Sequence, residues 1–414
     1  MSLNPRQTWL TFSRTRIGRV PHERLVAGIE LARSVEGMDR QRWLYRHAES
    51  VPAGNRFQFR DAHPPTAGDL DLCERLVAAH TAATASAPPA EGMWAEDLFE
   101  ERQSALRRPL ADQDARSLAF ALAEMFRTDV VLGMAAGSLG AREQTRLSRR
   151  VSWLNTVGKL VALGEALGAV RVENPEQGGV AVGLADGPDA VVTAIQSVLG
   201  LSIDFPEVGA AYGVLAAGRL ITPDTPDQLY GAHRLLEAVQ LHLEKRAAVS
   251  VVEIGGGYGG MAYWLLRMRE LPYTIVDLPL VNVIQGYFLA KALGADAVRL
   301  HGEHGKATVT VLPDHALEDI EGPVDVVVNK DSMPEIPLTA VKTYLEWTKR
   351  NCTGILYSYN QEAGAEFHGT AQNVVPEVVA QIGGFTRIRR EPSWLRRGYA
   401  EEIYRPSPED SRRP

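Results

Sequence analysis

The sequence predicts an α/β protein, in which a mainly α-helical N-terminal domain precedes a parallel sheet that is covered by helices and ends in an antiparallel hairpin. Three observations support this prediction. Up to about residue 244, apolar residues recur at spacings of three and four, as they do on packed helices. From Val249 onward, short strand-like runs alternate with helical patterns, which is typical of a parallel sheet. The last two strand-like runs have no helix between them, so they should pair antiparallel.

In the N-terminal half, the helical spacing is clearest in two segments, 114–140 and 146–170. The stretch HTAATASAPPAEG, residues 80–92, is small, polar and proline-bearing, so we expect an exposed connection there. A further amphipathic helix should run from about Pro226 to Lys245, because a proline stands at its first turn.

The change of rhythm after this helix suggests a domain boundary. We place the helical domain at 1–224, where it would serve as a lid, a substrate-binding unit or a dimer surface, and the sheet domain at 225–405. Residues 406–414 lack apolar content and should form a disordered tail.

The sheet domain alternates strands and helices in a regular order. The predicted strands are, in order, VSVVEI, YTIV, ATVTVL, VDVVVN, GILYSYN, FTRIRREP and GYAEEIYRP. The predicted helices between them are 259–270, 281–293, 338–350 and 371–382. Such alternation buries both faces of a parallel sheet under helices.

Composition excludes several classes of protein. With 45% hydrophobic and 23% charged residues the chain is ordinary for a soluble globular protein. Its net charge of -7 argues against holding polyanions by bulk charge, so we expect no nucleic-acid partner.

The cysteines and the N-terminus bear on location. Cys73 and Cys352 are too few for a disulfide framework or a cysteine metal site, which fits a reducing compartment. The first residues lack a signal-peptide core, and no window reaches ~18 uninterrupted apolar residues. We therefore expect a cytoplasmic protein with no membrane partner.

The stretch VVEIGGGYGG, 251–260, joins a strand to a helix through five glycines, which lets the backbone approach a ligand closely. Gly255, Gly257 and Gly260 match the dinucleotide pattern G-x-G-x-x-G, with Asp277 about 20 residues on at the next strand end. The same letters also place an acid, Glu253, just before the glycines. A carboxylate there would repel the pyrophosphate of NAD but suit the ammonium and sulfonium groups of S-adenosylmethionine.

Three segments in order carry a resemblance to a known family: VVEIGGGYGGMAYWLL, YTIVDLPLVNVIQGYFLAKALG and VDVVVNKDSMPEIP. They resemble the class I S-adenosylmethionine-dependent methyltransferases and, more narrowly, the sugar O-methyltransferases of bacterial natural-product pathways. The resemblance covers about 225–405 and implies a Rossmann-like methyltransferase sheet with S-adenosylmethionine as cofactor. The first 220 residues or so carry no motif of this kind.

The resemblance also assigns roles to residues that match the family pattern. It implies that Glu253, Gly255 and Gly257 border the methionine moiety, that Asp277 binds the ribose and that Leu278 covers the adenine. Asp314 would contact the adenine amino group, although Pro313-Asp314 also fits a turn and helix cap. Asn329 would hydrogen-bond the methionine part or hold its own turn.

The acceptor should lie beyond the ends of the fourth and fifth strands, where the base that takes its hydroxyl proton is also expected. The candidates for the base are Asp331, Glu335 and His368. A divalent metal held by these acids is an alternative that the sequence neither indicates nor rules out. Aromatic residues near the same edge could face a sugar or pack in the core: Tyr258, Tyr263, Trp264, Tyr357 and Tyr359. Tyr230 and His233, on the helix before the glycines, could reach the cofactor.

Together these observations predict an O-methyltransferase that acts on a sugar or a glycosylated small molecule, with a homodimer as a possible assembly. Two alternatives stay open. The glycines and Asp277 also fit an NAD-dependent oxidoreductase, and the cofactor fold could belong to a non-catalytic subunit that binds S-adenosylmethionine for a partner.

Overall fold

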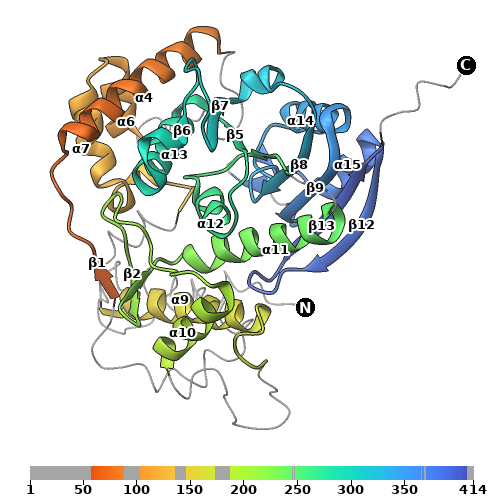
Figure 1. Cartoon of the computed structure of the whole chain (residues 1–414), viewed down its shortest axis with the longest axis horizontal. Coiled ribbons are helices and arrows are strands. Elements are labelled where there is room, and N and C mark those ends of the chain that lie inside the picture. Colours follow the sequence, from red (N-terminus) through yellow and green to blue (C-terminus); the bar gives the residue numbers. More distant parts are fainter. Residues whose placement is uncertain are drawn as a thin grey trace, which may run out of the picture.

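The computed structural model describes residues 57–87, 103–135, 146–172, 187–244, 246, 248–364, 366–367 and 370–407 (Figure 1). Its helices are α4 (Ala67–Ser86), α6 (Ser104–Ala111), α7 (Ala115–Ala123), α9 (Arg146–Ala166), α10 (Gly187–Leu199), α11 (Thr225–Leu243), α12 (Gly260–Met268), α13 (Pro279–Leu293), α14 (Leu338–Asn351) and α15 (Val375–Ile382). Its strands are β1 (Phe57–Phe59), β2 (Tyr212–Ala216), β3 (Arg219–Ile221), β4 (Val251–Ile254), β5 (Tyr273–Asp277), β6 (Val298–Arg299), β7 (Val309–Pro313), β8 (Val324–Lys330), β9 (Cys352–Gln361), β10 (Glu366–Phe367), β11 (Thr370–Ala371), β12 (Phe385–Pro392) and β13 (Tyr399–Pro406).

The main sheet has eight strands in the order β12-β13-β9-β8-β4-β5-β7-β6. Strands β4 to β9 are parallel, whereas β13 runs antiparallel to both β9 and β12. The predicted fold class is confirmed: a mainly helical N-terminal part precedes a Rossmann-like parallel sheet with an antiparallel C-terminal hairpin.

Alternate residues of each central strand face opposite layers of helices. Val251 belongs to the apolar cluster under α11, α12 and α13, while Val252 and Ile254 belong to the cluster under α14 and α15. In Figure 1 these two groups of helices lie on opposite sides of the sheet. All four residues of β4 are buried, as expected of a central parallel strand.

The N-terminal helices share a core with the sheet. Residues of α4, α7 and α9 lie in the same apolar cluster as those of α11 to α13. Helix α4 packs on α13, where Lys291 Nζ lies 2.5 Å from Asp69 Oδ1. The division at 224/225 stays a prediction, and the tail from 408 onward lies outside the described residues.

The expected connection at 80–92 was wrong for its first part. The chain is helical up to Ser86, because alanine favours helix and the hydroxyls of Thr81 and Thr84 bond back to carbonyls four residues earlier. Residues 88–92 lie outside the described residues. A three-stranded sheet, β1-β2-β3, was also missed. Its hairpin turns at Ala217-Gly218, both with positive φ (49° and 72°), as a two-residue type I′ turn requires.

One further boundary differs from the prediction. The helix expected over 371–382 begins only at Val375, because Ala371 belongs to β11 and Pro376 occupies the first turn of α15.

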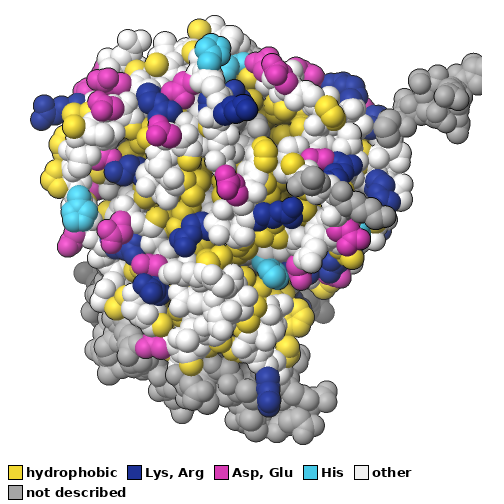
Figure 2. All heavy atoms as spheres, viewed as in Figure 1, with side chains coloured by type: hydrophobic (Ala, Val, Ile, Leu, Met, Phe, Trp, Pro, Cys, Tyr) yellow, Lys and Arg dark blue, Asp and Glu magenta, His cyan; other side chains and the backbone are white. Residues whose placement is uncertain are grey.

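The surface of the described residues carries both signs of charge. On the face seen in Figure 2, basic and acidic side chains are interspersed, and neither gathers into one large patch. No helix in the described part of the chain is both long and apolar enough to cross a bilayer.

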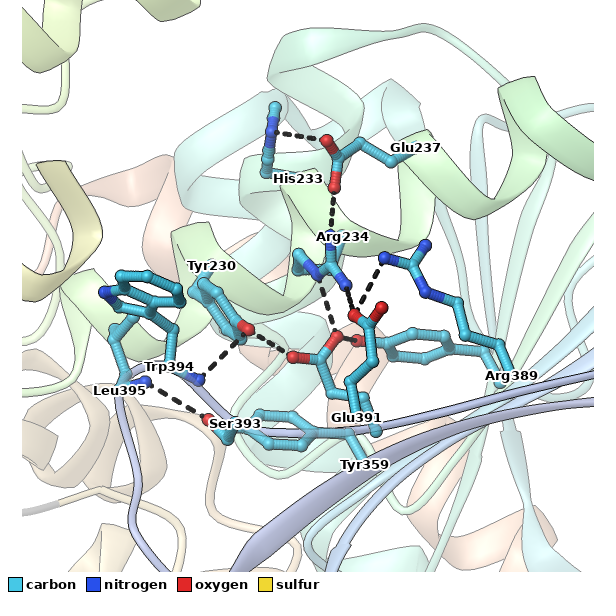
Figure 3. Close-up of polar contacts among 12 residues, drawn as sticks. Tyr230, His233, Arg234, Glu237, Tyr359, Arg389, Glu391, Ser393, Trp394 and Leu395 are labelled. Carbon is cyan, nitrogen blue, oxygen red and sulfur yellow. Dashed lines mark hydrogen bonds and ion pairs between the residues drawn. The ribbon is translucent and has the colours of Figure 1, made fainter. Parts of the chain in front are cut away.

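A buried carboxylate joins α11 to the C-terminal hairpin. Glu401 on β13 is 3% exposed and accepts hydrogen bonds from Tyr230, from Tyr357 Oη at 2.9 Å and from Arg234 Nε at 2.9 Å. Arg234 also reaches Glu391 Oε2 at 2.6 Å, so one guanidinium spans both strands of the hairpin (Figure 3). The hairpin is thereby held against the helix that precedes the glycine turn.

Replacing Arg234 with Met should destabilise the protein by about 3–5 kcal/mol, because it leaves the carboxylate of Glu401 buried without its cation. Urea unfolding measures this loss, and adding Glu401→Gln to the same chain should recover part of it. Arg350→Met is the matched control, since Arg350 pairs with Glu318 on the surface and should cost less than about 1 kcal/mol. Equal losses in Arg234→Met and Arg350→Met would contradict the role given to this network.

Candidate functional site

The candidate site lies where the carboxyl ends of β4, β5, β8 and β9 meet. The chain leaves β4 for β5 on one side, whereas β8 pairs with the other side of β4. In open α/β sheets such a switch point is where ligands bind.

The glycine turn after β4 is pressed against its surroundings. A Cβ added at Gly255, which has φ +70°, would lie 2.1 Å from Ser332 Oγ. A Cβ at Gly256 would lie 2.8 Å from Ile275 Cγ2 and 2.9 Å from Glu253 Oε2. A side chain fits at neither position, so the turn presents bare backbone at the centre of the sheet edge.

Glu253 lies beneath this turn. The residue is 1% exposed, and its Oε2 accepts a hydrogen bond from Tyr273 Oη at 3.0 Å. Burial raises the pKa of this carboxyl to about 7, although Tyr273 and the charge of Lys330 act in the opposite direction. Glu253 therefore places a titratable carboxylate under the glycines.

Asp277 ends the neighbouring strand. Its Oδ1 accepts from the Leu278 N–H at 2.8 Å and its Oδ2 from Gln285 Nε2 at 2.8 Å. Burial raises the pKa of Asp277 to about 7, against the effect of these hydrogen bonds. Gln285 Nε2 also donates to the Gly257 carbonyl at 2.9 Å, so one amide ties the acid to the glycine turn.

Gln285 was not singled out from the sequence. The signal available there was a polar residue inside the otherwise apolar run VIQGYFLA of α13, where the structure buries it completely. Asn282, one turn earlier, donates to Gln285 Oε1 at 3.0 Å and so orients its amide.

Leu278 and Asp314 lie at the ends of β5 and β7. Leu278 is the half-buried N-cap residue of α13, and Asp314 begins a short 3-10 helix, Asp314–Asp319. Asp314 is close enough for its charge to raise the pKa of Asp277. His315 Nδ1 lies 3.3 Å from Asp314 Oδ1, and His315 Nε2 lies 3.3 Å from Ser86 Oγ. The end of α4 therefore borders this side of the site.

Asn329 and Ser332 hold the end of β8 against the glycine turn. Asn329 is fully buried, and its Nδ2 donates to the Ile254 carbonyl at 2.9 Å and to Ser332 Oγ at 2.5 Å. These contacts suit Asn329 to hold the turn rather than to bind a ligand.

Asp331 is engaged in an ion pair. Its backbone has φ +63°, and its carboxylate accepts from the Arg396 guanidinium and from Tyr399 Oη at 2.7 Å. Its own N–H donates to Asn360 Oδ1 at 3.0 Å. Arg396, in the turn between β12 and β13, was not identified from sequence. Because a cation and a phenol already occupy its oxygens, Asp331 is a weak candidate for a base.

Glu335 lies one turn beyond Asp331 and is half-buried. Burial, reinforced by the charge of Asp331, raises the pKa of Glu335 to about 7, while Arg396 lowers it. Among the described residues no hydrogen bond or ion pair to the Glu335 carboxylate is found. His368 lies outside the described residues, and within them no group of three or more His, Cys, Asp or Glu side chains is arranged to hold a metal ion.

The aromatic residues expected near this edge are buried in the core. Those with less than 4% exposure are Tyr258, Tyr263, Trp264, Tyr357 and Tyr359. The Tyr230 hydroxyl is bonded to Glu401, and His233 lies 3.5 Å from Glu237. The polar atoms of both residues therefore already have partners on the protein.

No family model matches the chain, and no curated protein sequence does. Solved structures similar to part of it include the N-methyltransferase NodS from Bradyrhizobium japonicum WM9 with S-adenosyl-L-homocysteine, at 15% identity over 43% of this chain and 87% of that one, TM-score 0.32. Another is the magnesium protoporphyrin IX methyltransferase ChlM from Synechocystis PCC 6803 with the same ligand, at 13% identity over 44% and 86%, TM-score 0.31. A third is the N-terminal domain of EvdMO1 with S-adenosyl-L-homocysteine and D-fucose, at 13% over 44% and 83%, TM-score 0.29.

Likeness at this level does not establish a shared fold or function.

Glu253→Gln should stabilise the protein at pH 8 by roughly 1–3 kcal/mol, because glutamine still accepts from Tyr273 and removes a buried charge. The folded-state pKa of about 7 lies above the ordinary value of 4.5, so ionisation of Glu253 lowers stability as the pH rises from 4.5 through 7. The gain should therefore shrink toward pH 5. Melting temperatures from pH 5 to 8 test this, with exposed Glu321→Gln as the control. The same pH slope in Glu253→Gln as in the unmodified protein would contradict it.

Proposed function

We propose that the protein is an S-adenosylmethionine-dependent methyltransferase that methylates a hydroxyl group of a sugar or of a glycosylated small molecule. The observation that carries the proposal is the pair of carboxylates around the glycine turn: Glu253 lies beneath it, and Asp277 is tied to it by Gln285. The Glu253 carboxylate opposes a pyrophosphate and suits a ligand that carries an ammonium and a sulfonium, while Asp277 suits ribose hydroxyls.

The antiparallel strand β13 supports the same proposal, because a dinucleotide-binding sheet does not call for such an ending. In this arrangement Gly255 and Gly257 would border the methionine moiety. Asp277 would accept hydrogen bonds from the ribose, and Leu278 and Asp314 would flank the adenine. The sugar acceptor rests on the family resemblance of the sequence.

Bound S-adenosylmethionine would supply an electrophilic methyl group. The protein's own part is to hold the acceptor hydroxyl in line with that methyl and to take its proton. We assign the proton to a carboxylate oxygen of Glu335, whose pKa near 7 lets it be ionised and still basic at neutral pH. Asp331 keeps that pKa high by repulsion, and Arg396 holds Asp331 in place.

An NAD-dependent oxidoreductase is the second reading of the glycines, and the position of Glu253 under the turn disfavours it. A non-catalytic subunit would also keep the turn and Asp277. Methyl transfer by the purified protein distinguishes the proposal from a non-catalytic subunit.

Calorimetric titration with S-adenosylhomocysteine and, in parallel, with NAD tests the cofactor. We expect binding of the first and none of the second, and we expect Asp277→Ala to abolish binding because the ribose loses its acceptor. Asp296→Ala, an exposed acid distant from the glycine turn, is the control. Binding of NAD alone would overturn the proposal.

Glu335→Gln should lower kcat by about 10²- to 10⁴-fold while leaving S-adenosylhomocysteine binding intact, since it removes the base and not the cofactor site. The acceptor is first identified by mass shift among sugar candidates. The rate in the unmodified enzyme should rise with pH through about 7, because the base must be ionised. Asp331→Asn should move this rise in the rate to lower pH, since it removes the repulsion that raises the pKa of Glu335. Unchanged turnover in Glu335→Gln would end the assignment.

A further inference from the structure

Lys330 makes one long hydrogen bond and one contact with an aromatic ring among the described residues. It is the last residue of β8, and its Nζ lies 3.4 Å from Gln228 Oε1 on α11 and 5.8 Å from the centre of the Tyr359 ring. Within the described residues no carboxylate lies within ion-pair distance of it. A Cβ at Gly231 would come within 3.2 Å of Lys330 Cδ, so this glycine of α11 leaves room for the lysine stem.

The carboxylates around Lys330 are already engaged. Asp227 on α11 lies 3.4 Å from Lys159 Nζ and 3.7 Å from Arg396 Nε. Glu253 accepts from Tyr273 under the glycine turn. Lys330 is near enough to lower the pKa of both Asp227 and Glu253, yet it pairs with neither. Among the described residues, its charge is thus left without a counter-ion.

The position of Lys330 relates it to the glycine turn. In the pairing of β4 with β8, Asn329 stands opposite Ile254, so Lys330 follows on β8 where Gly255 begins the turn on β4. A half-buried ammonium is costly unless it meets an anion, and a ligand over the turn would bring one within its reach.

We infer that Lys330, with Gln228 beside it, binds the α-carboxylate of the amino-acid moiety of the S-adenosyl cofactor. The inference rests on the proposed function and adds to it the group that recognises the one anionic part of this ligand. An anionic group on the acceptor is the other source of the same chemistry, and the test below separates the two.

The experiment compares two ligands by calorimetry: S-adenosylhomocysteine, which has the carboxylate, and 5′-methylthioadenosine, which lacks the amino-acid part. Lys330→Met keeps the stem against Gly231 and should weaken S-adenosylhomocysteine binding about ten- to a hundredfold, the usual effect of losing a charge-assisted hydrogen bond. Binding of 5′-methylthioadenosine should stay as in the unmodified protein. Lys330→Arg should retain most of the affinity. Lys342→Met, at an exposed position on α14, is the matched control and should change neither ligand.

Three outcomes would overturn the inference. The first is equal affinity of Lys330→Met and the unmodified protein for S-adenosylhomocysteine, which would leave the proposed function intact. A raised KM for the acceptor in that variant would then show that Lys330 binds an anionic group of the acceptor. A parallel loss of 5′-methylthioadenosine binding would show that the effect is not specific to the carboxylate. Failure of the unmodified protein to bind S-adenosylhomocysteine would remove the proposed function and this inference together.

Discussion

The close approach of the glycine turn to its neighbours is the constraint on which the rest of the site depends. The backbone at Gly255 and Gly256 comes so near Ser332 and Glu253 that no side chain fits between them. Asn329 fixes one side of the turn by bonding the Ile254 carbonyl, and Gln285 fixes the other side through Gly257. The ends of three parallel strands therefore meet at a strip of bare backbone that lies between two carboxylates, Glu253 and Asp277.

Much of the sheet domain was predictable because its signals are local. The β-branched runs and the helices between them alternate with clear periods, and a buried parallel strand needs no partner-specific residue to be recognised. The errors fell where local signals compete. Ala217-Gly218 is a hairpin turn that lacks the usual Asn or Asp, and the alanines of 80–86 outweighed their small polar neighbours in favour of helix.

The site was predictable only in part for a different reason. Glu253 and Asp277 could be placed because each stands at a strand end in a known spacing from the glycines. Asp331 and Glu335 could not be told apart, since both are acids in one short loop. What distinguishes them is Arg396, which lies 65 residues after Asp331 and reaches it only through the fold of the C-terminal hairpin. A contact between residues so far apart in the chain produces no local pattern that a single sequence could reveal.

The same contact bears on how the molecule is assembled. The turn that carries Arg396 lies between β12 and β13, which follow every other strand of the sheet in chain order. During synthesis the glycine turn, β5 and β8 can associate first, because their contacts are closer in sequence. Until the hairpin docks, Asp331 lacks the guanidinium of Arg396 and the hydroxyl of Tyr399. The ion pair that holds Asp331 is thus completed only by the hairpin that is synthesised last.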